Sequence, residues 1–116
     1  MNLAALILSI SFVILPQPQL SAYCQASTVA CYNYSHNRIA LDENLSGTVL
    51  QIALAHEIGH ALTRNATLEE YRAVWGDKPI KELREDAAWS FTWLAWFPQT
   101  VSEREKQFFI PLLLEN

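Results

Sequence analysis

The pattern of apolar and polar residues predicts a long buried helix in the middle of the chain. Over residues 46–64 apolar side chains are spread nearly all round a helical surface, which is typical of a helix inside a protein core. Between Ile52 and Leu62 three polar residues interrupt this run, His56, Glu57 and His60. A core accepts such residues only with hydrogen-bonding partners or a bound metal, so the helix indicates chemistry as well as packing.

Shorter elements are predicted on both sides of this helix. Residues 28–33 and 38–41 favour β structure and have turn residues between them, which predicts a short hairpin. Residues 67–76 begin with a capping box and end at a glycine, which is typical of a short helix. Residues 80–97 contain no breaker and are followed by Pro98, so we expect a second long helix there.

The N-terminal apolar run has the length of the hydrophobic region of a signal peptide. It covers residues 3–15 and is too short for a comfortable membrane span. We therefore expect residues 1–22 to be a signal or N-terminal apolar segment, residues 23–116 to be the domain, and the protein to be secreted or periplasmic. The alternative is a cytoplasmic protein in which this run is a helix packed on the central helix.

Two further features bear on the fold at its ends. Cys24 and Cys31 predict a disulfide in an exported chain, with buried free thiols as the alternative. Residues 108–114 are apolar around one proline and are expected to complete the core. A docking surface for a partner or a membrane is the alternative for this C-terminal tail.

Length and charge narrow the classes of protein. A chain of 116 residues can bury one core, so we expect one small domain. The formal net charge is −4, and the eight basic residues are scattered from Arg38 to Lys106 without a cluster. Nucleic-acid binding is therefore not expected.

The three polar residues of the central helix form an H-E-x-x-H motif. Residues four apart lie on one face of a helix, so His56 and His60 can reach a single metal ion while Glu57 points to its open position. The expected ion is one zinc, and Glu57 is the expected general base for a zinc-bound water. This chemistry predicts hydrolysis of peptide bonds in a protein or peptide substrate.

A third ligand is expected from the helix at residues 80–97. Glu82, Glu85 and Asp86 share one side of it. A carboxylate from a second helix can be the third ligand of a metal ion that two imidazoles already bind. Periodicity alone leaves the choice among them open. By residue type only, Tyr71 and His36 are candidates for stabilising an oxyanion.

Residues 85–98 are similar to the second conserved block of the ImmA/IrrE-like metallopeptidases, E-x-x-A-[DN]-x-F-A-x-x-L-L-x-P, without a gap. With the hairpin and the H-E-x-x-H motif, the resemblance covers residues 28–98 in that family's order. It implies His56, His60 and Glu85 as the metal ligands and Glu57 as the base. Known members include cytosolic peptidases that cleave helix-turn-helix repressors, so an exported member would have another substrate.

The block departs from the family pattern in two ways, and the choice of third ligand has one rival. Trp89 stands where the family often has an Asp or Asn that supports the site, and Trp93 and Trp96 make the block rich in aromatic residues. The rival is Glu82 as third ligand, because Glu82 and Asp86 form the E-x-x-x-D arrangement of thermolysin-like enzymes, whose Asp supports a ligand histidine.

The expected fold is a small α+β zincin-like domain, in which a short hairpin packs with the H-E-x-x-H helix and a second helix delivers the third ligand. The expected function is zinc-dependent peptide hydrolysis. One alternative is a zinc-binding regulatory or interaction module that does not cleave. The other is a membrane-associated interaction protein whose apolar ends are the functional parts.

Overall fold

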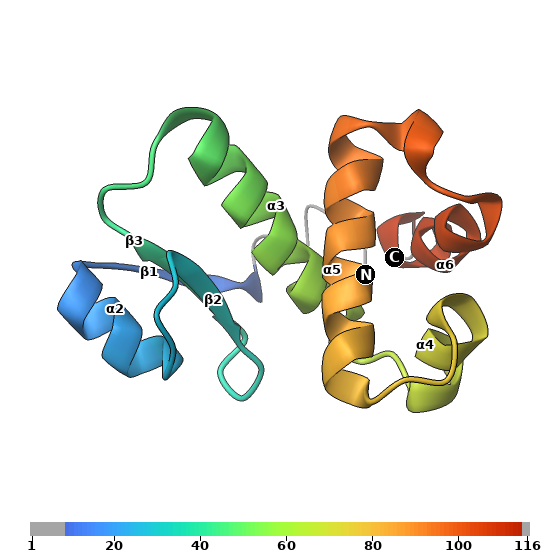
Figure 1. The fold of residues 1–116 in the computed structure, drawn as a ribbon, viewed down its shortest axis with the longest axis horizontal. Helices are drawn as coiled ribbons and strands as arrows, with labels where there is room; N and C mark the ends of the chain where they lie inside the picture. The colour runs from blue at the N-terminus through green and yellow to red at the C-terminus, as the bar shows by residue number, and fades with distance from the viewer. Residues whose placement is uncertain (1–8, 115–116) are drawn as a thin grey trace.

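The structure is a computed structural model that describes residues 9–114. In this range it contains three strands and five α-helices, which confirms the expected α+β class. Figure 1 shows the sheet on one side of the molecule, α4 and α6 on the other, and α3 leading from the sheet to α5. The elements are, in chain order, β1 (Ser11–Leu15), α2 (Gln17–Cys24), β2 (Ala30–Asn33), β3 (Arg38–Asp42), α3 (Gly47–Thr63), α4 (Leu68–Trp75), α5 (Ile80–Trp96), the 3-10 turn η1 (Pro98–Thr100) and α6 (Glu103–Leu114).

The three strands form one sheet in the order β1-β3-β2. β2 and β3 are the predicted antiparallel hairpin, and its turn holds Asn37 at a φ of 49°, a conformation that Asn adopts more readily than most residues. β1 pairs with β3 in parallel, with Ser11 opposite Arg38. The sequence does not predict this third strand, because residues 11–15 read as the end of the apolar N-terminal run.

The described part of the N-terminal segment belongs to the fold. Residues 11–22 supply β1 and most of α2, and both Ile10 and Leu20 are buried. Within this range the segment is a strand and a short helix, and not the single helix considered as the alternative. Residues 1–8, which hold the first part of the predicted signal, lie outside the described residues. Export stays a prediction.

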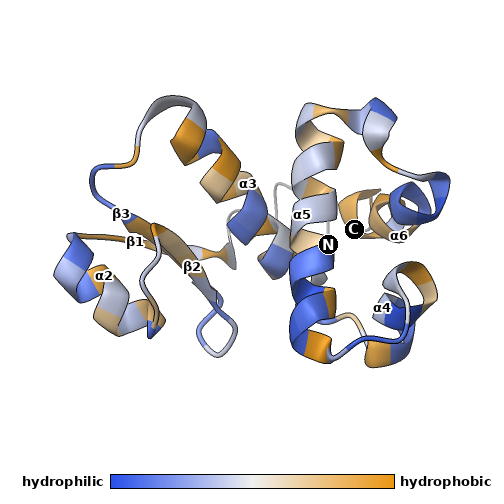
Figure 2. Cartoon of the chain, in the orientation of Figure 1, coloured by the Kyte–Doolittle hydropathy of each residue, from blue (hydrophilic) through white to orange (hydrophobic). Residues whose placement is uncertain are grey.

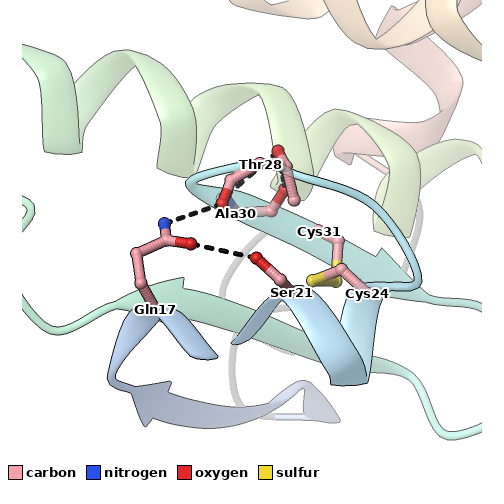
Figure 3. The surroundings of a disulfide bond; sticks show 6 residues. All are labelled: Gln17, Ser21, Cys24, Thr28, Ala30 and Cys31. Carbon is pink, nitrogen blue, oxygen red and sulfur yellow. Dashed lines mark hydrogen bonds between the residues drawn. A yellow bond between two sulfur atoms is a disulfide. The ribbon is translucent and has the colours of Figure 1, made fainter. Parts of the chain in front are cut away.

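The predicted disulfide is present and joins α2 to β2 (Figure 3). The Cα atoms of Cys24 and Cys31 are 5.9 Å apart. Near it the Gln17 side-chain amide donates to the Thr28 carbonyl at 3.0 Å, and the Ser21 hydroxyl donates to the Gln17 amide oxygen at 3.0 Å. These bonds and the disulfide together fix α2 against the loop that leads into β2.

The two long helices, α3 and α5, match the predicted ranges and pack against each other. They lie close together at Gly59, where an added Cβ would lie 2.9 Å from the Ala88 Cα and 3.0 Å from its carbonyl oxygen. Behind this contact the core joins the sheet to the helices through buried side chains such as Ile39, Leu62 and Phe91. The small residues at the crossing therefore set how near α5 comes to α3.

The predicted capping box opens α4, with reciprocal bonds between Thr67 and Glu70. α6 places Phe109 in the core with no exposed surface, as expected of the apolar tail, while Ile110 and Leu114 are exposed. None of the helices within residues 9–114 combines the length and the hydropathy that a membrane span needs.

Candidate metal centre

α3 presents the motif residues toward β2 and α5. His56 is partly buried, and Glu57 and His60 are each only 6% exposed. One possible ligand atom from each of the three lies within 4.8 Å of those of the other two. His56, Glu57 and His60 could therefore hold a metal ion.

α5 brings the Glu85 carboxylate onto both imidazoles. One Glu85 oxygen lies 2.9 Å from His60 Nε2 and the other lies 3.2 Å from His56 Nε2. Both imidazoles thus turn the same ring nitrogen toward one carboxylate. Of the three acidic candidates on α5, Glu85 is the one at the site: Asp86 accepts from the Lys78 ammonium at 2.8 Å, and Glu82 is exposed, with no hydrogen bond or ion pair to any residue in the described range.

Tyr34, just beyond the end of β2, fixes the other side of His60. Its hydroxyl lies 2.7 Å from His60 Nδ1. Because a carboxylate only accepts hydrogen bonds, His60 carries its proton on Nε2 in this arrangement and Nδ1 accepts from the Tyr34 hydroxyl. The Arg84 guanidinium stands 4.5 Å from the centre of the Tyr34 ring, which holds the ring between α3 and α5.

His56 is held differently. Its Nδ1 is buried and has no hydrogen-bond partner within residues 9–114, and the Trp89 ring centre lies 4.4 Å from the imidazole centre. The resemblance places an Asp or Asn at the position of Trp89. The structure thus has an aromatic contact to His56 where that pattern would supply a hydrogen bond.

Burial sets the charges of the motif residues. Burial, with a smaller effect of the Glu85 charge, raises the pKa of Glu57 to about 8. Burial lowers the pKa of His60 to about 4, against the opposing effect of Glu85, and it lowers the pKa of His56 too. Near neutral pH both imidazoles are therefore neutral, which is the form that binds metals. A divalent cation would favour the ionised form of Glu57.

The site lies in a cleft of about 800 Å³ between α3, α5 and the outer strand β2. One wall carries the aliphatic side chains of Val29, Val49 and Ile52, which are exposed to solvent. The other wall is α5, with Lys81 and Trp89 on either side of Glu85. The cleft lining includes His56, Glu57 and His60.

Two predicted candidates lie elsewhere. Tyr71 is buried beside α5 and its hydroxyl donates to the Thr63 carbonyl at 2.7 Å. His36 is exposed in the hairpin turn, as expected of a surface histidine, and does not line the cleft. The sequence reasoning missed Arg84. Its position next to Glu85 was visible, but its contact with Tyr34 depends on how the hairpin meets α5.

Searches against known protein families, curated proteins and solved structures find no match to this chain. The resemblance to the ImmA/IrrE-like metallopeptidases therefore rests on the residues quoted above.

Proposed function

We propose that the protein is a zinc-dependent metallopeptidase with a zincin-like fold. The observation that carries the proposal is the convergence of His56 Nε2, His60 Nε2 and the Glu85 carboxylate, with the buried Glu57 beside them. In this proposal His56, His60 and Glu85 hold the ion and Glu57 is left free for proton transfer.

The donor set fits zinc. Two neutral imidazoles and one carboxylate, with a position left for water, are the ligands of many catalytic zinc sites. Bound there, zinc would supply a Lewis acid that makes water a better nucleophile at neutral pH and polarises the carbonyl of a peptide. Both imidazoles are neutral near pH 7, so they need not lose a proton before they bind the ion.

The remaining chemistry belongs to side chains of this chain. A Glu57 carboxylate oxygen takes the proton from the attacking water and returns it to the nitrogen of the leaving amine. Tyr34 fixes the orientation of His60. Within residues 9–114 β2 is an outer strand of the sheet and lines the cleft, and an outer strand can hold an extended substrate through backbone hydrogen bonds.

The disulfide supports the predicted export. A bond such as that between Cys24 and Cys31 persists in oxidising compartments and is rare in the cytosol. The proposed substrate is therefore a protein or peptide met outside the cytoplasm.

A second function is favoured by one observation. The missing hydrogen bond at His56 Nδ1, with Trp89 in place of a polar residue, leaves one proposed ligand without the support that metal-binding histidines usually have. A zinc-binding regulatory module that does not cleave peptides is the alternative.

The test compares metal content and hydrolysis in the wild type and in Glu57→Gln. The variant should keep one zinc per chain and lose hydrolysis of a denatured protein by about 10²- to 10⁴-fold, as expected for loss of a general base. Equal hydrolysis in the two proteins would remove Glu57 from the mechanism. Zinc in both with no hydrolysis in either would support the regulatory module.

A matched pair of variants tests the third ligand. Glu85→Ala should weaken zinc binding far more than the roughly 10- to 100-fold typical of a residue that only supports a ligand. Glu82→Ala, three residues away on the same helix, should leave affinity unchanged. Circular dichroism of both variants checks the fold, and the opposite result would make Glu82 the ligand.

A further inference from the structure

A row of neighbouring side chains forms one winding face of α5. Residues four apart are neighbours on a helix, so Lys81, Glu85, Trp89 and Trp93 follow one another along it, and Phe97 lies one residue past its end. Each step of four residues rises about 6 Å and turns about 40° around the axis, so this face covers about 18 Å and about 120° between Lys81 and Trp93. It starts with a cation, passes the proposed metal centre and ends with three aromatic rings. Figure 2 shows the same polarity, with a hydrophilic first half of α5 and a paler second half.

The aromatic rings form a continuous exposed row. The centres of Trp89 and Trp93 are 6.2 Å apart and those of Trp93 and Phe97 are 5.9 Å apart. The three residues are 43%, 46% and 48% exposed. Large aromatic side chains rarely stay in contact with water in such a row unless they bind something. The row begins at Trp89, which lines the cleft and touches the proposed ligand His56, and Trp93 and Phe97 lie beyond the cleft lining.

The opposite end of this face is basic. Lys81 and Arg84 line the cleft, and neither forms an ion pair with a carboxylate within residues 9–114. Elsewhere Arg72, Lys78 and Lys106 each pair with an acidic side chain, and Arg38, Arg64 and Arg104 donate hydrogen bonds to the Ser11 hydroxyl or to backbone carbonyls. Within residues 9–114 the Lys81 side chain has neither an ion pair nor a hydrogen bond, and Arg84 lies over the Tyr34 ring. In a chain of net charge −4, two cations without a carboxylate partner beside a cleft favour a negatively charged ligand.

We propose that this face of α5 binds an extended peptide with acidic residues at one end and large apolar residues at the other. The acidic side chains lie beside Lys81 and Arg84, the apolar ones lie along Trp89, Trp93 and Phe97, and the peptide bond between the two blocks lies at the metal centre. This inference rests on the proposed function, because it names the substrate class of that same site.

Helix geometry sets the spacing of the two blocks. Lys81 lies about 6 Å along α5 from Glu85, and Trp93 lies about 12 Å from it on the other side. A strand advances about 3.3 Å per residue, so the acidic residue sits about two positions from the cleaved bond. The apolar residues fill up to about four positions on the other side as far as Trp93.

The experiment measures peptide binding to zinc-loaded Glu57→Gln protein, which holds the peptide without cutting it. The probe is a ten-residue peptide without Trp, with two Asp, two Ala and then Leu and Phe residues, in both sequence directions. Binding is followed by the intrinsic Trp emission and by calorimetry. The comparison peptides replace Asp by Lys or the apolar block by Ser.

One direction of the parent peptide should bind at least about tenfold more tightly than either comparison peptide, a difference of about 1.4 kcal/mol. Trp93→Ala and Lys81→Ala, both exposed and outside the proposed ligand set, should each weaken binding by about tenfold. Ile110→Ala and Lys106→Ala on α6 are the matched controls and should have no effect. Equal affinity for all peptides would overturn the inference.

Wild-type protein on the same peptides separates this inference from the proposed function. Binding that depends on Lys81 and Trp93, without cleavage, would keep the peptide site and reject the peptidase. Cleavage of all peptides at one rate, unchanged in both variants, would keep the peptidase and reject the site. The last measurement replaces the peptides by vesicles of 3:1 phosphatidylcholine and phosphatidylglycerol. A Trp93-dependent emission shift with vesicles and none with peptides would make the row a lipid contact and overturn the inference.

Discussion

Tyr34 can form a hydrogen bond with either neutral form of His60. A hydroxyl can both donate and accept, so Tyr34 donates to Nδ1 when Nε2 carries the proton. If Nε2 bound the proposed metal, the proton would move to Nδ1, and the same hydroxyl would accept from it. An Asp carboxylate at position 34 accepts hydrogen bonds but does not donate them, so it would favour only the form with the proton on Nδ1.

We therefore predict that Tyr34→Phe weakens zinc binding by about tenfold, the lower end of what loss of a supporting hydrogen bond costs. The free energy of unfolding of the metal-free protein should change little more than for one lost hydrogen bond, about 1 kcal/mol. Competition with a chromophoric chelator measures the affinity. The control is Tyr32→Phe, whose hydroxyl donates to Asn37 and not to a histidine. Unchanged affinity in Tyr34→Phe would show that Tyr34 does not support His60.

The raised pKa of Glu57 sets the direction in which the stability of the metal-free protein changes with pH. Its pKa is raised from 4.5 to about 8, so between these values the unfolded chain has lost a proton that the folded protein keeps, and stability falls as pH rises. His60, lowered from 6.5 to about 4, acts the other way, but only below pH 6.5. From pH 6.5 to 8, therefore, only Glu57 of these two residues changes the free energy of unfolding.

With a chelator present, the free energy of unfolding of the wild type should fall by about 1–2 kcal/mol from pH 6.5 to 8. Glu57→Gln carries no charge and should lack this part of the fall. Urea unfolding of both proteins at the two pH values measures it, and the difference between them cancels the contributions of other groups. Parallel curves for the two proteins would contradict the raised pKa.

Among the helices, the contact of α3 with α5 decides whether the Glu85 carboxylate reaches the imidazoles of His56 and His60. The sequence places Gly59 inside the motif, where glycine weakens a helix, and Ala88 one turn beyond Glu85. The structure shows why both are small: their backbones touch, with no room for a Cβ on Gly59. A larger residue would move the Glu85 carboxylate away from the imidazoles.

Gly59→Ala should destabilise the protein by about 1–3 kcal/mol, because overpacking outweighs the better helix propensity of Ala. It should also weaken zinc binding. Gln51→Ala, on the exposed side of the same helix, is the control and should stay within about 0.5 kcal/mol of the wild type. Thermal unfolding and chelator competition measure the two effects. A Gly59→Ala protein as stable as the wild type would mean that the helices can separate at little cost.

Local signals predicted α3, α4 and α5, and the sheet in part, and they did not predict α2. The capping box at Thr67 and the prolines at 79 and 98 fix the helix boundaries because they act through neighbouring residues. β1 was missed because a short apolar run is ambiguous and its partner, β3, follows more than twenty residues later. Parallel pairing leaves no turn signal between the strands.

In the candidate site, too, local spacing predicts some contacts and the packing of elements decides the others. Spacing within one helix predicted that His56, Glu57 and His60 come together. Periodicity left Glu82 and Glu85 on one side of α5, and only the packing of the helices places Glu85 on the imidazoles. The contact of Tyr34 with His60 depends on which face of the hairpin meets α3, and strand periodicity alone does not give that.

On the scale of the whole molecule, β1 and α2 make the N-terminal segment part of the fold. We predict that protein lacking residues 1–22 loses about 3–6 kcal/mol, from the removed burial of Ile10 and Leu20 alone. That is comparable to the whole stability of a small domain, so it should be largely unfolded. Soluble yield and thermal unfolding of residues 1–116 and 23–116 measure the difference. Equal stability would agree with a removable signal and would make β1 dispensable.

The parallel pairing of β1 with β3 also sets the order in which the strands can pair during synthesis. β1 is made first, but its partner follows 23 residues after β1 ends. At about 5–20 residues per second, ribosomal synthesis leaves an interval of about one to five seconds between them. The hairpin of β2 and β3 can close locally in microseconds, whereas β1 must wait for it. During that interval the apolar segment is accessible to other cellular factors. The same stretch of chain can therefore be recognised as an export signal before it folds as strand β1.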